Sequence, residues 1–544
     1  MNYFSYPYPS RRTVVMARNG MVATSQPLAA QVGIEILQKG GNAIDAAIAT
    51  AAALTVLEPT SNGIGGDAFA IVYHHGALYG LNASGPAPEA LTLETLQAYL
   101  KRYGLAEMPA VGWPAITVPG APLAWAALVQ RFGRLSLRAV LEPAIRYAEE
   151  GFPVSPRVSY DWARAVKHYE KARTLPHIQD KPEVLQAWFD TFTVDGRAPL
   201  AGEWIRFPYH AKTLQAIGET EGRAFYEGDL AQAIEAESIK YEGWLRGDDL
   251  KQFAVEWVDP LRIHYRGYDV LELPPNGHGL VALMALGMLA NGTWSERETV
   301  HTYHSAIEAI KLAYADARAH LADIEHMRYK PQDFLHPDYL RERYALIGVG
   351  AQIRDSGRPS AGGTVYLATA DGEGNMVSYI QSNYMGFGSG VVIPRTGIAL
   401  HNRGHNFSLE EGHPNVLAPR KRPYHTIIPG FLMKAGKAVG PFGVMGGFMQ
   451  PQGHVQVVMN MVDFALNPQA ALDAPRWQWL HGHKVALEYG VPRSVIEGLM
   501  ERGHDVHIEM ESGSFGRGQI IVRDPSGTLI GGSEPRADGG VAAW

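Results

Sequence analysis

One stretch of the chain limits its possible folds more than any other, the segment TVYLATADGEGNMVSYIQS at residues 364–382. On both sides of the central DGEGN the residues alternate with the period of two that is typical of β-strands. A Gly-containing turn between two such runs predicts an antiparallel hairpin. The chain must therefore build a sheet, and this hairpin opens with Thr364, directly after Gly362 and Gly363.

Helical patterns occupy much of the remaining chain. Their apolar spacing and their start and stop residues predict helices in residues 28–59, with a Gly-Gly break, and in residues 125–131, 136–150 and 293–322. Residues 62–85 predict a Gly-rich loop followed by two strands. Because no linker rich in Ser, Gly or Pro divides the chain, we expect one large layered unit of helices and sheets.

Composition excludes several functions. A formal net charge of -7 over 544 residues, without a stripe of Lys and Arg, makes nucleic acid an unexpected partner. No apolar run reaches the roughly 18 residues of a spanning helix, and the start MNYFSYPYPSRRTVVMARNG lacks the apolar core of a signal peptide. The chain has no Cys, which excludes disulfides and thiolate catalysis. We therefore expect a cytoplasmic protein without a membrane partner.

Common site motifs do not occur. The sequence holds no phosphate-binding P-loop, zinc-protease, serine-hydrolase or EF-hand pattern. His74 with His75, and His301 with His304, lack a third ligand at a suitable spacing, so we predict no metal. The GFGSG at residues 386–390 opens no evident helix and predicts a bend.

The residues before the hairpin suggest a different chemistry. A Thr hydroxyl becomes a useful nucleophile when the free α-amino group of the same residue acts as its base. The pKa of such an amine, about 7.7 to 8.0, suits proton exchange near neutrality. In the translated chain, Thr364 gains that amine only if the bond after Gly363 breaks, and a glycine there leaves the carbonyl sterically open to attack. The polar, Gly-rich residues 354–363 predict an exposed or mobile connector around this bond. By itself, however, Gly-Gly-Thr before a strand indicates only a turn.

Longer motifs narrow the interpretation. Seven segments occur in this order along the chain: GGNAIDAAIATAAALTVLEPTSNGIGGD, VPGAPLAWAALVQRFG, AIEAIKLAYADA, TVYLATADGEGNMVS, FGSGVVIPRTGI, KRPYHTIIP and MGGFMQPQGHVQVVMNMVDFALNPQAALDAPRW. Together they resemble the γ-glutamyltransferase family of N-terminal-nucleophile hydrolases, from about residue 23 to about residue 477. The resemblance implies an α+β fold, a four-layer αββα sandwich. It also implies a precursor that cuts itself into a large subunit, residues 1–363, and a small subunit, residues 364–544, which stay associated and dimerise further.

The resemblance also implies catalytic residues. It places the nucleophile at Thr364, an oxyanion hole at Gly446 and Gly447, and an assisting hydroxyl at Ser382. A loop without Cβ atoms lets backbone N–H groups approach a developing alkoxide. The alternatives are a tight loop for the glycine pair and an ordinary strand hydroxyl for Ser382.

The residues expected to hold the substrate depart from the family pattern. Ser84 replaces the Arg that binds the α-carboxylate of a glutamyl donor, and Asn406 replaces the acid that binds its α-amino group. The other changed or neighbouring positions are Tyr384, Asn402, Arg403, His425 and Thr426. Losing charge-assisted bonds of about 1.5 to 3 kcal/mol each would weaken a γ-glutamyl donor. Arg403 is then either a new carboxylate site or part of a surface ion pair.

These observations predict a self-processing amidohydrolase or acyltransferase. Its substrate would be a γ-glutamyl-like or related small acyl amide, oxamate being one candidate, with water or an amine as acceptor and no cofactor. One alternative is a true γ-glutamyltransferase or glutathione hydrolase with an altered donor clamp. A further alternative is an unprocessed protein that binds a small carboxylate without chemistry.

Overall fold

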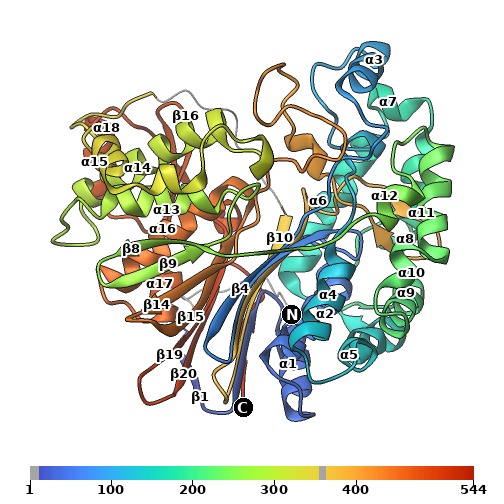
Figure 1. Cartoon of the computed structure of the whole chain (residues 1–544), viewed down its shortest axis with the longest axis horizontal. Coiled ribbons are helices and arrows are strands. Elements are labelled where there is room, and N and C mark those ends of the chain that lie inside the picture. The colour runs from blue at the N-terminus through green and yellow to red at the C-terminus, as the bar shows by residue number, and fades with distance from the viewer. Residues whose placement is uncertain (1–11, 354–362) are drawn as a thin grey trace.

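The computed structural model describes residues 12–353 and 363–544, and two seven-stranded sheets form its centre (Figure 1). The first sheet contains, in spatial order, β21 (Gly540–Ala543), β2 (Gly20–Thr24), β10 (Gly363–Asp371), β11 (Met376–Tyr384), β3 (Asp67–His74), β4 (Ala77–Ala83) and β7 (Glu256–Val258). All its pairings are antiparallel. The hairpin predicted at residues 364–382 is confirmed as β10 and β11, in the middle of this sheet.

The second sheet is also antiparallel throughout. Its spatial order is β1 (Val15–Ala17), β20 (Leu529–Ser533), β19 (Arg517–Arg523), β15 (Lys437–Met445), β14 (Gly430–Lys434), β9 (Tyr268–Glu272) and β8 (Leu261–Tyr265). Three smaller sheets pair β5 (Phe152–Pro153) with β6 (Trp204–Ile205), β12 (Val392–Ile393) with β13 (Ile398–Ala399), and β16 (Trp477–His481) with β17 (Lys484–Glu488) and β18 (Asp505–Glu509).

Helices cover the outer face of each large sheet (Figure 1). The first sheet packs against α1 (Pro27–Gln38), α2 (Ala43–Leu57) and α4 (Ala121–Phe132), with α5 (Leu137–Glu150) against α2. The second sheet packs against α13 (Gly279–Leu289) and α16 (Gln450–Val462), with α14 (Val300–His320) against α13. The order helix, sheet, sheet, helix confirms the predicted αββα sandwich.

The remaining helices lie around these layers. They are α3 (Leu93–Tyr103), α6 (Pro156–Ala172), α7 (Pro176–Gln179), α8 (Gln186–Phe192), α9 (Pro208–Glu219), α10 (Arg223–Tyr226), α11 (Asp229–Lys240), α12 (Gly247–Lys251), α15 (Pro337–Tyr344), α17 (Pro468–Asp473) and α18 (Arg493–Glu501). The four predicted helical segments are confirmed, with differences at their ends; α4, for example, begins at Ala121 rather than at residue 125. The helix predicted over residues 293–322 begins only at Val300, because Thr299 is extended and its side chain caps the helix by accepting from the Thr302 N–H.

Two polar caps attach α2 to the hairpin. Asn42 caps the helix and forms a reciprocal capping box with Asp45. Asp371, at the turn end of β10, accepts a hydrogen bond from the Ala43 N–H at 3.0 Å. The first turn of α2 is thereby fixed to the hairpin that carries Thr364.

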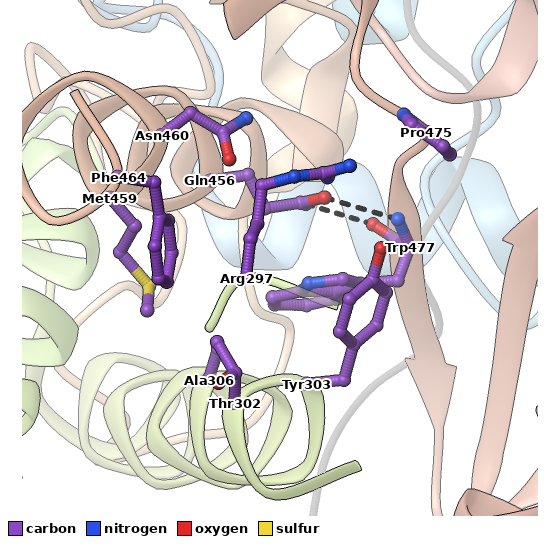
Figure 2. A pocket seen from close by; sticks show the side chains of 10 residues that line it. All are labelled: Arg297, Thr302, Tyr303, Ala306, Gln456, Met459, Asn460, Phe464, Pro475 and Trp477. Carbon is purple, nitrogen blue, oxygen red and sulfur yellow. Dashed lines mark hydrogen bonds between the residues drawn. The ribbon is translucent and has the colours of Figure 1, made fainter. Parts of the chain in front are cut away.

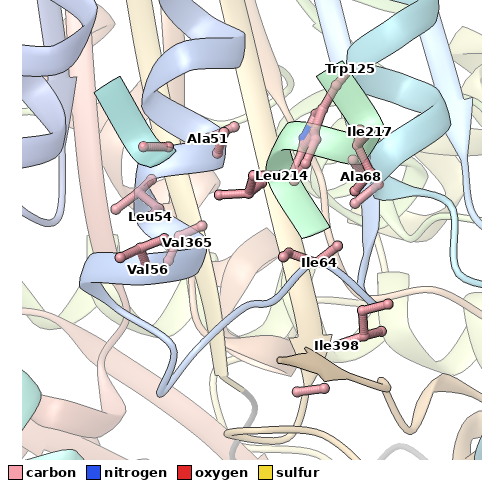
Figure 3. Packing of buried hydrophobic residues seen from close by; sticks show 14 of the residues in the cluster. Ala51, Leu54, Val56, Ile64, Ala68, Trp125, Leu214, Ile217, Val365 and Ile398 are labelled. Carbon is pink, nitrogen blue, oxygen red and sulfur yellow. The ribbon is translucent and has the colours of Figure 1, made fainter. Parts of the chain in front are cut away.

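The alternation along the hairpin sorts its side chains between two cores. Val365 belongs to the core beneath α2, where Figure 3 shows it beside Leu54 and Val56. Tyr366 and Ile380 belong to the core between the two sheets. This is the arrangement that a period of two produces when both faces of a strand are buried.

Two further expectations concern the connector and the membrane. Residues 354–362 of the predicted connector lie outside the described residues. Within the described parts of the chain, no helix combines the length and the apolar character needed to cross a bilayer.

Candidate active site

The predicted nucleophile lies at the open end of the central hairpin. Thr364 is 1% exposed, and its Oγ1 lies 3.1 Å from the Oγ of Ser382 on the neighbouring strand. The Ser382 hydroxyl also accepts a hydrogen bond of 2.7 Å from the Tyr384 N–H. A serine oxygen that is fixed in this way can orient the threonine hydroxyl, which is the role that the resemblance implies for Ser382.

The backbone at this end of the hairpin is irregular. Gly363 pairs with Tyr384, Val365 pairs with Gln381, and the register shifts between them. Such bulges change the direction of a side chain and are common beside active sites. Tyr384 has a φ of 73°, in the left-handed region, which costs a non-glycine residue roughly 1 kcal/mol or more. The local strain coincides with the predicted nucleophile.

The predicted oxyanion glycines follow the end of β15. Gly446 has a φ of 136° and Gly447 a φ of 58°, and both lie at the start of the short helix η6 (Gly447–Met449), which leads into α16. N–H groups at a helix start have no acceptor within their own helix. The loop can therefore offer donors to a developing oxyanion, and the positive φ angles explain why glycine is needed here.

A cleft of about 370 Å³ connects these two strand ends. It is bordered by Met385, directly after β11, and by Gly446, directly after β15. One face of α6 forms the opposite wall. Of the predicted site residues, Asn402 and Gly446 line this cleft, whereas Thr364 and Ser382 are not among its lining residues. Because the cleft reaches the predicted oxyanion loop, it is the candidate binding site for a substrate.

A fully enclosed ionic cluster lies beside this site. Arg403 Nε lies 3.1 Å from Asp67 Oδ2, and His425 Nε2 lies 2.6 Å from the same oxygen. Arg403 also donates to Thr426 Oγ1 at 2.7 Å, and its guanidinium lies 4.5 Å from the centre of the Tyr384 ring. Of the predicted positions, Arg403 and His425 thus meet at one carboxylate, and Tyr384 and Thr426 contact the Arg403 guanidinium.

Burial and the charges of neighbouring side chains set the protonation states of Asp67 and His425. Burial alone would raise the pKa of Asp67, but Arg403 and then His425 outweigh it and hold that pKa well below its usual range. Burial, and secondly the charge of Arg403, lower the pKa of His425 to about 4. His425 is therefore neutral at neutral pH, and it donates from Nε2 to Asp67 and accepts at Nδ1 from the Ile427 N–H.

The interpretation of Arg403 as part of a surface ion pair is wrong. Its side chain is 0% exposed, because Asp67, the cross-strand neighbour of Ser382, pairs with the guanidinium inside the protein. The charge of Arg403 is balanced by this carboxylate. An incoming carboxylate would have to compete with Asp67 for the same donors.

The other expected binding positions differ in their surroundings. Asn402 borders the cleft, but its amide bonds the Met385 N–H and the Ala110 carbonyl. Asn406 is half-buried in the short helix η5 (Arg403–Asn406), and within the described parts of the chain its Nδ2 has no hydrogen-bond acceptor. Ser84 is buried and donates to Asn82 Oδ1 at 2.8 Å, so it offers no free donor to a substrate carboxylate.

Asp67 is the residue that the sequence reasoning missed. The signal was present in the motif NGIGGD, where an acid follows a Gly-rich loop and begins a buried strand. A charged residue at the start of a fully buried strand needs a partner. Nothing in the sequence, however, connects it to Arg403, 336 residues later.

A second enclosed cluster adds two partners to His304. Its Nδ1 lies 2.8 Å from His504 Nε2, and Glu308 lies one turn further along α14. These groups have the spacing of metal ligands, but the Lys311 ammonium already lies 2.7 Å from Glu308 Oε1. His304 also bonds the Gly348 carbonyl, so the cluster attaches the segment that leads to the connector.

A small pocket of about 30 Å³ lies in the opposite helical layer, between α14 and α16 (Figure 2). Figure 2 shows Tyr303 and Trp477 facing each other there, and Gln456 bonded to the backbone of Trp477. None of the predicted site residues lines it. We attribute this pocket to a small gap in the packing between the two helices.

Comparison with known proteins identifies the family of this chain. Residues 29–544 match the family described as Gamma-glutamyltranspeptidase. The chain belongs to the gamma-glutamyltranspeptidase family. This confirms the resemblance that the motifs indicated and identifies the chain as an enzyme.

Several gamma-glutamyltranspeptidase-family relatives match over nearly their full length. The glutathione hydrolase-like YwrD proenzyme of Bacillus subtilis is 37% identical, over 96% of this chain and 98% of the relative. The oxamate amidohydrolase proenzyme of Klebsiella pneumoniae is 33% identical, over 97% of this chain and 99% of the relative. The crystal structure of cephalosporin acylase from Bacillus halodurans has a TM-score of 0.95 at 56% identity, covering 100% of this chain and 99% of that chain.

Proposed function

We propose that this protein cuts its own chain between Gly363 and Thr364 and then uses Thr364 as an N-terminal nucleophile to cleave a small acyl amide. The observation that carries the proposal is the buried hydroxyl pair of Thr364 and Ser382, 3.1 Å apart. Its support includes the relatives that are called proenzymes and the structural neighbour that is called an acylase. The products of the cut, residues 1–363 and 364–544, stay together because β10 and β11 of the small chain pair with β2 and β3 of the large chain.

The reaction needs only groups of this chain. The Thr364 hydroxyl oxygen attacks the amide carbonyl while the α-amine of the same residue takes its proton. The Gly446 and Gly447 N–H groups hold the tetrahedral oxyanion, and one such donor is typically worth about 2.7 to 4 kcal/mol. Collapse breaks the C–N bond, and the α-ammonium returns the proton to the leaving amine. Water or an amine then attacks the acyl ester and releases Thr364.

The cluster around Asp67 favours a small acyl group over a γ-glutamyl group. Ser84, in place of the glutamyl-binding Arg, is occupied by Asn82, and the charge of Arg403 is balanced by Asp67. Oxamate remains one candidate acyl amide, because its two-carbon acyl group is much smaller than a γ-glutamyl group and one relative is an oxamate amidohydrolase proenzyme. The rival function, a γ-glutamyltransferase with a rearranged clamp, predicts faster release of aniline from a γ-glutamyl anilide than from a glutaryl or oxalyl anilide.

Intact mass spectrometry of the purified protein tests the proposal. We expect two chains of about 40 and 20 kDa, with the small chain beginning at Thr364. Thr364→Ala should leave one chain and no turnover, while Thr364→Ser, which keeps a hydroxyl, should still be cut. An uncut wild-type chain that hydrolyses amides would refute the mechanism. An uncut chain that binds a small carboxylate without turnover would favour the binding-protein alternative.

A further inference from the structure

One face of α6 lines the cleft that Met385 and Gly446 border. The lining residues Arg157, Asp161, Arg164, Ala165 and His168 recur at spacings of three and four. Such spacing places side chains on a single helix face. The helix is held at this site by Tyr169, whose hydroxyl donates to the Gly388 carbonyl at 2.9 Å, in the loop after β11.

Two of the three arginines that line the cleft have partners. Arg157 binds Asp161 with two hydrogen bonds of 3.0 Å, and Arg517 binds the same carboxylate at 2.6 Å. Behind them, Glu58 lies 3.5 Å from Arg517, and Asp538 accepts the backbone N–H of Arg157. These two guanidinium groups therefore belong to an ionic cluster with three carboxylates, and this cluster shapes the wall.

Arg164 differs from both. Among the described residues, no carboxylate forms an ion pair with it, and its guanidinium lies 6.0 Å from the centre of the Tyr160 ring. His168, one turn further along α6, supplies no second charge, since burial, and secondly Lys171, lower its pKa. Much of the remaining wall is apolar, contributed by Ala110, Ala165, Tyr169, Met385, Phe387 and Met445. Arg164 is exposed, so its guanidinium is open to a ligand in the cleft. A largely apolar cleft with one cation that has no ion-pair partner suits an organic ligand that carries an anionic group.

The enclosed cluster decides which part of the substrate reaches this cleft. Arg403 and His425 both bond Asp67, and all three side chains are 0% exposed, so this cluster has no free cation for a carboxylate on the acyl side. The open cleft of about 370 Å³ then remains for the amine side of the amide.

We propose that this cleft holds the amine portion of the substrate and that Arg164 binds a carboxylate on it. The inference rests on the proposed amidohydrolase function and adds the substrate class: small acyl amides of amines that bear a carboxylate. Arg164 is then a specificity-determining residue, contributed by the large chain to the chemistry of the small one.

Four substrates separate the two positions of a carboxylate. They are the butyryl and glutaryl amides of aniline and of 4-aminobenzoate, and the release of either amine is followed by absorbance. For the wild-type enzyme we expect a kcat/KM about tenfold or more higher for 4-aminobenzoate amides than for anilides of the same acyl group. Arg164→Gln should bring this ratio close to one, mainly through KM, and Arg164→Lys should retain part of it. Lys167→Gln, a charge change on the same helix outside the cleft lining, should leave the ratio unchanged.

Two results would overturn the inference. One is a ratio that Arg164→Gln leaves intact, and the other is a preference that follows the glutaryl carboxylate whatever the amine. If no amide is turned over at all, the proposed function fails, and binding of 4-aminobenzoate against aniline, measured by ligand-observed NMR, still tests the cleft. Tighter binding of 4-aminobenzoate that Arg164→Gln abolishes would support the site independently of catalysis, and equal binding of the two amines would refute it.

Discussion

Asparagine in place of Asp67 removes one charge from the enclosed cluster and changes its shape little. The carboxylate has hydrogen-bond contacts at 3.1 Å to Arg403 Nε and at 2.6 Å to His425 Nε2, and no part of the three side chains is exposed. Removing one partner of a buried ion pair costs about 3 to 5 kcal/mol, because the other charge stays buried without compensation. We expect Asp67→Asn to lower the free energy of unfolding by that amount, a large share of the total stability of a typical domain.

Urea unfolding followed by tryptophan fluorescence measures this change. All variants should carry Thr364→Ala, so that a single covalent chain is compared in each case. The matched control is the double variant Asp67→Asn with Arg403→Met. It removes the charge that Asp67→Asn would leave unpaired, and the side-chain oxygen of the introduced asparagine can still accept from His425. Because apolar replacement of a whole buried pair is often close to neutral, the double variant should recover most of the lost stability.

Two outcomes would refute this reasoning. A loss below about 1 kcal/mol for Asp67→Asn would mean that water or another group compensates Arg403. A double variant no more stable than the single variant would mean that shape, rather than charge, determines the effect of Asp67.

Three further predictions address single contacts. Ser382→Ala removes the hydroxyl that bonds Thr364, so self-cleavage followed by electrophoresis should slow at least tenfold, while Ser382→Thr should retain most of the rate. Burial lowers the pKa of His210 to about 3, so below about pH 6.5 the unfolded state binds more protons than the folded state. The stabilisation from neutral His210 is therefore present above that pH, and the free energy of unfolding should fall by about 2 kcal/mol between pH 7.5 and 5. His210→Gln should reduce this pH dependence, measured by urea unfolding at each pH. Lys311→Met leaves Glu308 buried without its cation and should lower the free energy of unfolding by about 3 to 5 kcal/mol, whereas Lys311→Met with Glu308→Gln should recover most of it.

Features whose signal lies within a few neighbouring residues could be predicted from the sequence, and features that depend on distant residues could not. The hairpin was predictable because its period of two is read over a few residues, and α2 because Asn42 and Asp45 form a local capping box. The start of α14 was not predictable, because the residues before Thr299 share the apolar spacing of the helix. The helix begins after Thr299 because the side chain of Thr299 caps it. The positions of Arg403 and His425 near the site followed from the family motifs, but the family pattern gave no reason to expect their common partner.

The central hairpin, several of the helices, the family and the candidate nucleophile at Thr364 could be predicted from the residues alone. Each of these depends on residues that are neighbours in the chain or that occur in a fixed motif order. The charge balance of the site, by contrast, depends on how distant parts of the chain pack together. Asp67 meets His425 across 358 residues, and the α6 face meets Gly446 across one cleft. Such pairings arise when separate layers pack together, and local periodicity carries no record of which side chains then share a buried space.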